Sequence, residues 1–73
     1  MIKLLFFGSI ADKMGKRSMN LSAGKSLMEI IQEVGCVDFK PLLVAVNQEQ
    51  IRDMNYVVKS GDEVAIMPPF SGG

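Results

Sequence analysis

The sequence contains no histidine and no tryptophan, and it has a single cysteine, Cys36. Without histidine the chain lacks the side chain that most often serves as a general base near neutral pH and as a metal ligand. One cysteine without histidine excludes a Cys/His zinc site and the usual cysteine-protease arrangement. It also excludes an internal disulfide, so we interpret Cys36 as a small buried apolar side chain and expect a reducing, cytoplasmic location.

The chain also has no net charge, because eight basic and eight acidic residues cancel. The basic residues are scattered, with only Lys16 and Arg17 adjacent, so we expect no nucleic-acid partner. No apolar run approaches the roughly 20 residues of a membrane span, and the first residues lack the layout of a signal peptide. We therefore expect no membrane partner either.

The residue patterns that usually carry catalysis are missing as well. Asp62 and Glu63 are adjacent on an expected strand, so their side chains point to opposite faces and cannot work as an acid–base pair. The glycines Gly8, Gly15 and Gly24 lack the spacing of a phosphate-binding loop. We conclude that the chain is not an enzyme on its own, and we expect it to bind no metal and no cofactor.

With 73 residues, of which 48% are hydrophobic, the chain is predicted to be a single domain with one small core. Alternating or continuous apolar patterns predict strands over 2–7, 17–21, 42–46 and 63–67, with a short edge strand over 50–52. We expect a loop over 8–16, a turn over 47–50, and a connector over 53–60 whose Tyr56, Val57 and Val58 lie against the core.

The clearest helix covers 26–34. Ser26 and Glu29 have the spacing of a capping box, and Gly35 is placed to end the helix. Its apolar residues recur at helical spacing and form one stripe: Leu27, Ile30, Ile31 and Val34. One amphipathic helix on a mixed sheet predicts a two-layer α+β domain. The element order fits a β-grasp (ubiquitin-like) roll, in which the first and last strands are parallel neighbours at the centre.

The end of the chain is its most distinctive part. Gly61 and Asp62 favour a turn, the strand over 63–67 follows, and Pro68-Pro69 ends it because proline has no N–H for a sheet. Residues 70–73 then form a flexible, thin tail, and residues 68–73 extend to at most about 20 Å. A terminal Gly-Gly alone is most often a frayed end. After a strand and a Pro-Pro stop, it suits delivery of the Gly73 carboxylate into the narrow active site of another protein.

This ending, Gly-Asp-Glu-Val-Ala-x-x-Pro-Pro-x-Ser-Gly-Gly, resembles the C-terminus of the MoaD/ThiS family of sulfur carriers. The resemblance continues more weakly over 2–7 and 45–48. It implies the β-grasp fold and the role of small subunit of molybdopterin synthase. In that role an E1-like (MoeB-like) enzyme uses ATP to adenylate Gly73, sulfur converts it to a thiocarboxylate, and the sulfur passes to cyclic pyranopterin monophosphate in the large (MoaE-like) subunit. The implied assembly is a heterotetramer.

The resemblance makes Gly73 the reacting residue and places Phe70, Ser71 and Gly72 in the inserted tail. The sequence departs from the family at Ala11, where an arginine is common, in the short segment 35–41, and at Phe70, where valine is commoner. A carrier for thiamine thiazole synthesis, a protein-conjugating modifier and a plain interaction domain remain alternatives.

The last strand also predicts a partner-binding face. Val64 and Ile66 should face the helix, which leaves Ala65 and Met67 opposite, beside Leu5 and Phe7 of the first strand. We expect these side chains to form an apolar patch with Pro68, Pro69 and Phe70, and such a patch usually marks an interface. The alternative is that residues 48–60 fold over this face as a second core layer.

Overall fold

Two strands from opposite ends of the chain lie side by side at the centre of the sheet. In the computed structural model, which describes residues 1–35 and 42–68, β1 (Ile2–Phe6) pairs in parallel with β5 (Glu63–Met67). β2 (Ser18–Leu21) joins β1 antiparallel, and β3 (Leu43–Val46) joins β5 antiparallel. β4 (Glu49–Gln50) completes the order β2-β1-β5-β3-β4. This is the β-grasp order, so the predicted α+β fold is confirmed.

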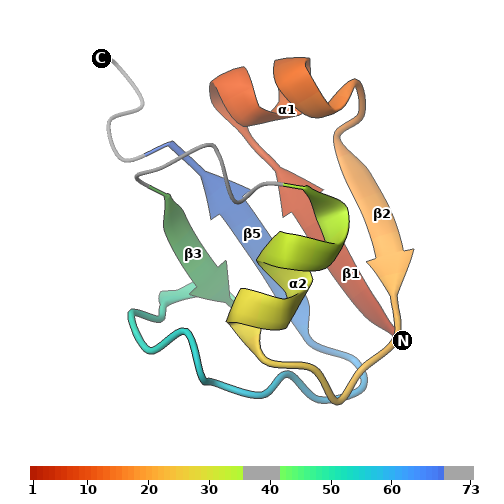
Figure 1. The fold of residues 1–73 in the computed structure, drawn as a ribbon, viewed down its shortest axis with the longest axis vertical. Coiled ribbons are helices and arrows are strands. Elements are labelled where there is room, and N and C mark those ends of the chain that lie inside the picture. The colour runs from red at the N-terminus through yellow and green to blue at the C-terminus, as the bar shows by residue number, and fades with distance from the viewer. Residues whose placement is uncertain (36–41, 69–73) are drawn as a thin grey trace.

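The helix α2 (Leu27–Val34) crosses one face of this sheet (Figure 1). The capping box forms as predicted: the Ser26 N–H donates to Glu29 Oε1 at 2.9 Å, and the Glu29 N–H donates to Ser26 Oγ at 3.2 Å. Gly35 closes the helix in the left-handed conformation. Within the described residues, no helix is long and apolar enough to cross a membrane.

Alternation along the strands places the core between the sheet and α2. Leu4 and Val64 are fully buried at adjacent positions of β1 and β5, and Ile30 of α2 is fully buried as well. The same cluster contains the remaining buried apolar side chains: Ile2, Phe6, Ile10, Leu21, Leu27, Ile31, Val44, Val46, Val58 and Ile66. No polar side chain among the described residues is buried with them.

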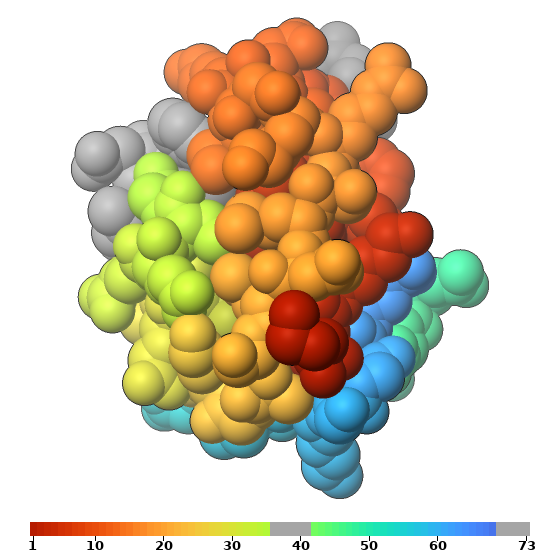
Figure 2. All heavy atoms as spheres, turned by 90° about the vertical axis from the view of Figure 1, so that its right-hand side faces the viewer, coloured from red at the N-terminus to blue at the C-terminus, as the bar shows by residue number. Residues whose placement is uncertain are grey.

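The predicted loop over 8–16 is wrong, because Gly8–Met14 forms the helix α1. The sequence lacks the usual signals for the start of this helix. The N-cap residue, Phe7, provides no side-chain cap, and the first turn has no acidic residue. What stabilises it is tertiary, since Ile10 is buried in the core and Ala11 and Met14 pack against it. Seen from the side, α1 lies at the end of the molecule opposite the turn that precedes β5 (Figure 2).

Three smaller expectations also need correction. β4 comprises Glu49–Gln50 rather than 50–52, and the turn before it is limited to Asn47 and Gln48. These two residues have positive φ angles of 53° and 72°, as a tight two-residue hairpin turn requires. In the connector, Val58 is buried and Tyr56 packs against the core as expected, but Val57 is 51% exposed. The first strand ends at Phe6 and the third begins at Leu43.

Candidate functional site

The sheet has a second face, opposite α2, that carries apolar side chains. On β5, Val64 and Ile66 are buried beneath α2, while Ala65 and Met67 point the other way and are half-buried. On β1, Leu5 is half-buried, and beyond the strand end Phe7 is 47% exposed. The predicted division of both strands into a core face and an open face is therefore confirmed.

Strand register brings in two residues that the sequence analysis missed. Ala65 lies between Leu5 of β1 and Ala45 of β3, and Met67 lies opposite Leu43. Both residues of β3 are half-buried, and they alternate with the buried Val44 and Val46. That alternation was visible in the sequence, but only the pairing of β3 with β5 shows which face they join. We call Leu5, Phe7, Leu43, Ala45, Ala65 and Met67 the open-face patch.

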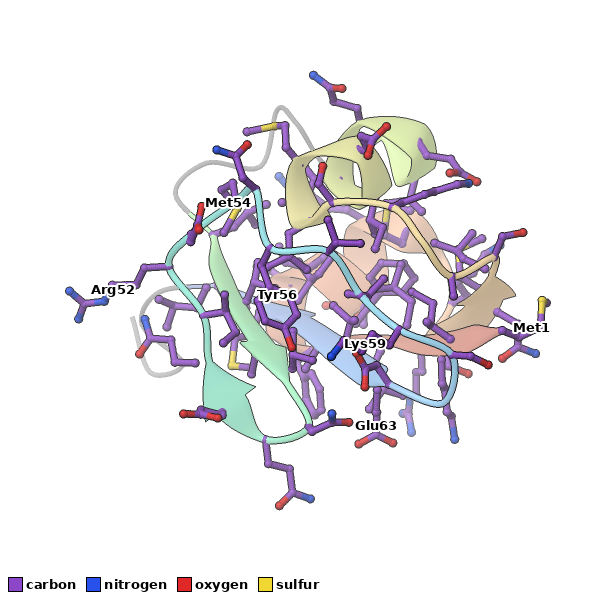
Figure 3. All side chains as sticks on the ribbon, turned by 90° about the horizontal axis from the view of Figure 1, so that it is seen from below. Met1, Arg52, Met54, Tyr56, Lys59 and Glu63 are labelled. Atoms are coloured by element: carbon purple, nitrogen blue, oxygen red, sulfur yellow. The ribbon has the colours of Figure 1, made fainter. Side chains whose placement is uncertain are left out.

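Residues 48–60 do not cover this patch as a second layer. Their backbone bonds to the start of α2: Leu27 N–H donates to the Tyr56 carbonyl at 2.9 Å, and Met28 N–H donates to the Met54 carbonyl at 3.0 Å. Gly24 and Val58 are joined in the same way at 3.0 Å. Figure 3 shows Met54 and Tyr56 on this segment, beside α2.

The chain leaves the sheet next to the patch and against α1. The Phe7 N–H donates to the Ile66 carbonyl at 3.0 Å, which ties the start of α1 to the end of β5. One residue on, Gly8 has a φ of +57°, and a Cβ there would lie 3.2 Å from Pro68 Cγ. Pro68 therefore packs closely on the Gly8 backbone, at the junction of β5 and α1.

The remaining predicted tail residues, Pro69, Phe70, Ser71, Gly72 and Gly73, lie outside the described residues, as does Cys36. The site role assigned to each of them stays a prediction. Pro68 is half-buried at the end of β5, beside the open-face patch.

A polar cluster fixes the other end of β5. Asn47 Nδ2 donates to Asp62 Oδ1 at 3.0 Å, and the Glu63 N–H donates to Asn47 Oδ1 at 3.0 Å. The Lys59 N–H donates to Asp62 Oδ2 at 2.8 Å. This backbone hydrogen bond, together with that from Asn47, lowers the pKa of Asp62 because both favour the charged carboxylate. The cluster anchors β5 at the end away from the chain exit.

The described residues contain no group of three His, Cys, Asp or Glu side chains that could hold a metal ion. What the geometry provides is an apolar face on three adjacent strands, with Pro68, the last described residue, at its edge. An exposed apolar face of this kind usually marks a contact with another protein. The fold and the site thus define a small β-grasp domain with an apolar face beside the point at which β5 ends.

Comparison with known proteins assigns the domain to a family. The ThiS family model matches residues 4–73. The chain is 33% identical over 82 residues to the molybdopterin synthase sulfur carrier subunit of Dictyostelium discoideum, covering 97% of this chain and 94% of that protein. It is 35% identical over 81 residues to the protein of the same name from Chlamydomonas reinhardtii, covering 99% and 98%. The chain belongs to the ThiS family.

A solved structure agrees with this assignment. The complex of subunits 1 and 2 of the molybdopterin-converting factor from Helicobacter pylori contains a chain with a TM-score of 0.69 and 25% identity. The match covers 99% of this chain and 97% of that one. The similarity in both sequence and structure therefore extends over the whole domain.

Proposed function

We propose that this chain is the sulfur carrier subunit of a molybdopterin synthase. The observation that carries the proposal is the match, over nearly the full length of both chains, to proteins of that name. The site is compatible with it, because β5 ends at Pro68 beside an apolar face. The resemblance of Gly61–Gly73 to the C-terminus of the family implies that the Gly73 carboxylate is the reacting group.

In the proposed reaction the Gly73 carboxylate attacks the α-phosphate of ATP on an E1-like enzyme, and pyrophosphate leaves. The product is an acyl-adenylate, whose carbonyl carbon is attacked by sulfur at the oxidation level of sulfide while AMP leaves, so that a thiocarboxylate remains on Gly73. ATP thus belongs to the activating partner, and the carrier itself holds no cofactor. Glycine has no Cβ, so Gly72 and Gly73 suit a channel too narrow for other residues.

The loaded tail then enters the large synthase subunit, where the sulfur attacks cyclic pyranopterin monophosphate. Two carriers are used for each dithiolene, in keeping with a heterotetramer of two small and two large subunits. The carrier contributes the nucleophile, whereas the substrate pocket and proton-transfer groups belong to the partner. We place this cycle in the cytoplasm, where a reducing environment keeps thiols reduced.

The open-face patch is the proposed contact with both partners. Leu5, Ala65 and Met67 lie on the face from whose edge the tail leaves, and each partner has to receive that tail. Binding to the activating enzyme and to the large subunit should therefore be mutually exclusive. A competition titration with the two purified partners tests this, and simultaneous binding of both would refute it.

Intact mass spectrometry of the protein from its native cells tests the function. A fraction heavier by the difference between oxygen and sulfur, located to Gly73 by fragmentation, is the expected result. Reconstitution with the E1-like enzyme, ATP, a sulfur donor and the large subunit should then yield molybdopterin. If the loaded protein supplies a thiazole synthase but not the large synthase subunit, it is a carrier for thiamine synthesis instead.

A further inference from the structure

A hollow of about 410 Å³ lies between the open-face patch and α1. Its apolar side includes Leu5 and Phe7, and its α1 side includes Ala11 and Asp12. Arg17, the residue before β2, closes it. A smaller hollow of about 270 Å³ shares the last three of these residues and continues to Gly15 and Lys16. We call the first of these spaces the α1 hollow.

The α1 hollow lies beside the point where the chain leaves the sheet. Gly8, which also lines it, is the residue on which Pro68 rests. The hollow is therefore bordered by the open-face patch on one side and by the chain exit on another. A protein that covers the patch and contacts Pro68 would therefore lie next to the hollow.

Arg17 gives the hollow a positive charge that has no ion-pair partner among the described residues. Its side chain is exposed, and no ion pair of its guanidinium is found with any residue in 1–35 or 42–68. Asp12 is likewise exposed and makes no such pair within the same residues, although both line the hollow. Lys16 adds a second cation to the adjoining space, so the two hollows together have more positive than negative side chains.

A partner that covers this surface would change the solvation free energy of the Arg17 guanidinium. In free solution water solvates the guanidinium, but a docked protein removes that water. A charge that loses its water without gaining a partner is strongly destabilising, whereas a carboxylate matches the guanidinium with two parallel hydrogen bonds. The apolar wall at Leu5 and Phe7 suits the methylene groups of the same acidic side chain.

We propose that the large subunit that receives the tail places an Asp or Glu side chain in the α1 hollow, where it pairs with Arg17. The inference rests on the proposed function and adds a charged, selective contact to the apolar one. It makes Arg17 a residue that favours the large subunit over proteins that cover the apolar patch without a matching carboxylate. Its effect should depend on salt, because dissolved ions screen the attraction between the two charges as the proteins approach.

The test is a titration of the large subunit with carrier variants at ionic strengths of about 0.05 M and about 0.5 M. Arg17→Glu should weaken binding at least about tenfold at the lower salt, and by less at the higher. Arg52→Glu is the matched control, because it makes the same charge change on a side chain that projects outward from the segment after β4 (Figure 3). The control should bind within about twofold of the unmodified protein.

Two further variants decide between pairing arrangements. Arg17→Gln removes the charge without adding repulsion and should weaken binding by a smaller factor. Asp12→Asn should leave binding unchanged or tighten it, because the partner's carboxylate then has no competitor. If Asp12→Asn instead weakens binding as much as Arg17→Gln, the two side chains pair with each other on docking and the proposal is wrong.

A charge exchange completes the experiment. Replacing the acidic residue of the large subunit by lysine should restore binding to Arg17→Glu, and no such rescue should occur with Arg52→Glu. Unmodified carrier that binds the large subunit and transfers sulfur supports the proposed function independently of Arg17. Arg17→Glu that then binds as well as Arg52→Glu would overturn this inference alone.

Discussion

Replacing Ile30 by alanine is the sharpest test of the fold that supports the site. Ile30 is fully buried between α2 and the sheet. The substitution removes three carbon atoms, which at about 0.8 kcal/mol per buried methylene accounts for about 2.4 kcal/mol. The cavity left behind adds to this, so we expect a loss of about 2–5 kcal/mol.

That loss is large for a domain of this size. At about 0.05–0.15 kcal/mol per residue, 73 residues give a total stability of about 4–11 kcal/mol. An unfolding entropy of about 2.1 cal/mol/K per residue gives about 0.15 kcal/mol/K for the chain. The expected decrease in Tm is therefore about 13–33 °C.

Thermal and urea unfolding monitored by circular dichroism measure both quantities. Gln32→Ala is the matched control, because Gln32 is exposed on the same helix and its loss should change stability by no more than about 0.5 kcal/mol. If Ile30→Ala melts within about 4 °C of the unmodified protein, α2 does not bury this face against the sheet, and the assignment of the two faces of the sheet fails with it.

Three further predictions concern the open face, the polar cluster and the tail. Met67→Asp should weaken the binding free energy for the large subunit by several kcal/mol, because it places an unpaired charge in a desolvated contact. The Tm of the free protein should change little. Normal binding would mean that the patch is not the interface. The lowered pKa of Asp62 means that its contribution to stability is present above the unfolded pKa of about 3.9 and is lost as pH falls through the lower folded value. The Tm difference between the unmodified protein and Asp62→Asn should therefore shrink in acid, and a difference independent of pH would contradict the cluster. Deleting Gly73 should abolish sulfur transfer with the Tm unchanged, and transfer from a variant with an extended, unprocessed tail would refute the carrier function.

Local sequence determined the elements whose signals are complete within a few residues. Ser26 and Glu29 cap α2 through their own spacing, and the left-handed Gly35 ends it. The alternation in β5 fixed which side chains face α2, because a strand has a period of two residues and one face must be buried. The Pro-Pro stop and the terminal Gly-Gly likewise led to the sulfur-carrier hypothesis without any knowledge of packing.

Tertiary structure decided what depends on contacts between distant segments. The helix α1 has weak local signals, and it forms where Ile10 can be buried against the end of the sheet. Leu43 and Ala45 join the open-face patch only through the register of β3 with β5. Arg17 borders the α1 hollow because β2 returns antiparallel beside β1 and α1 lies across their end. Register and burial depend on which distant segments pair, so they cannot be predicted from any short stretch of the sequence.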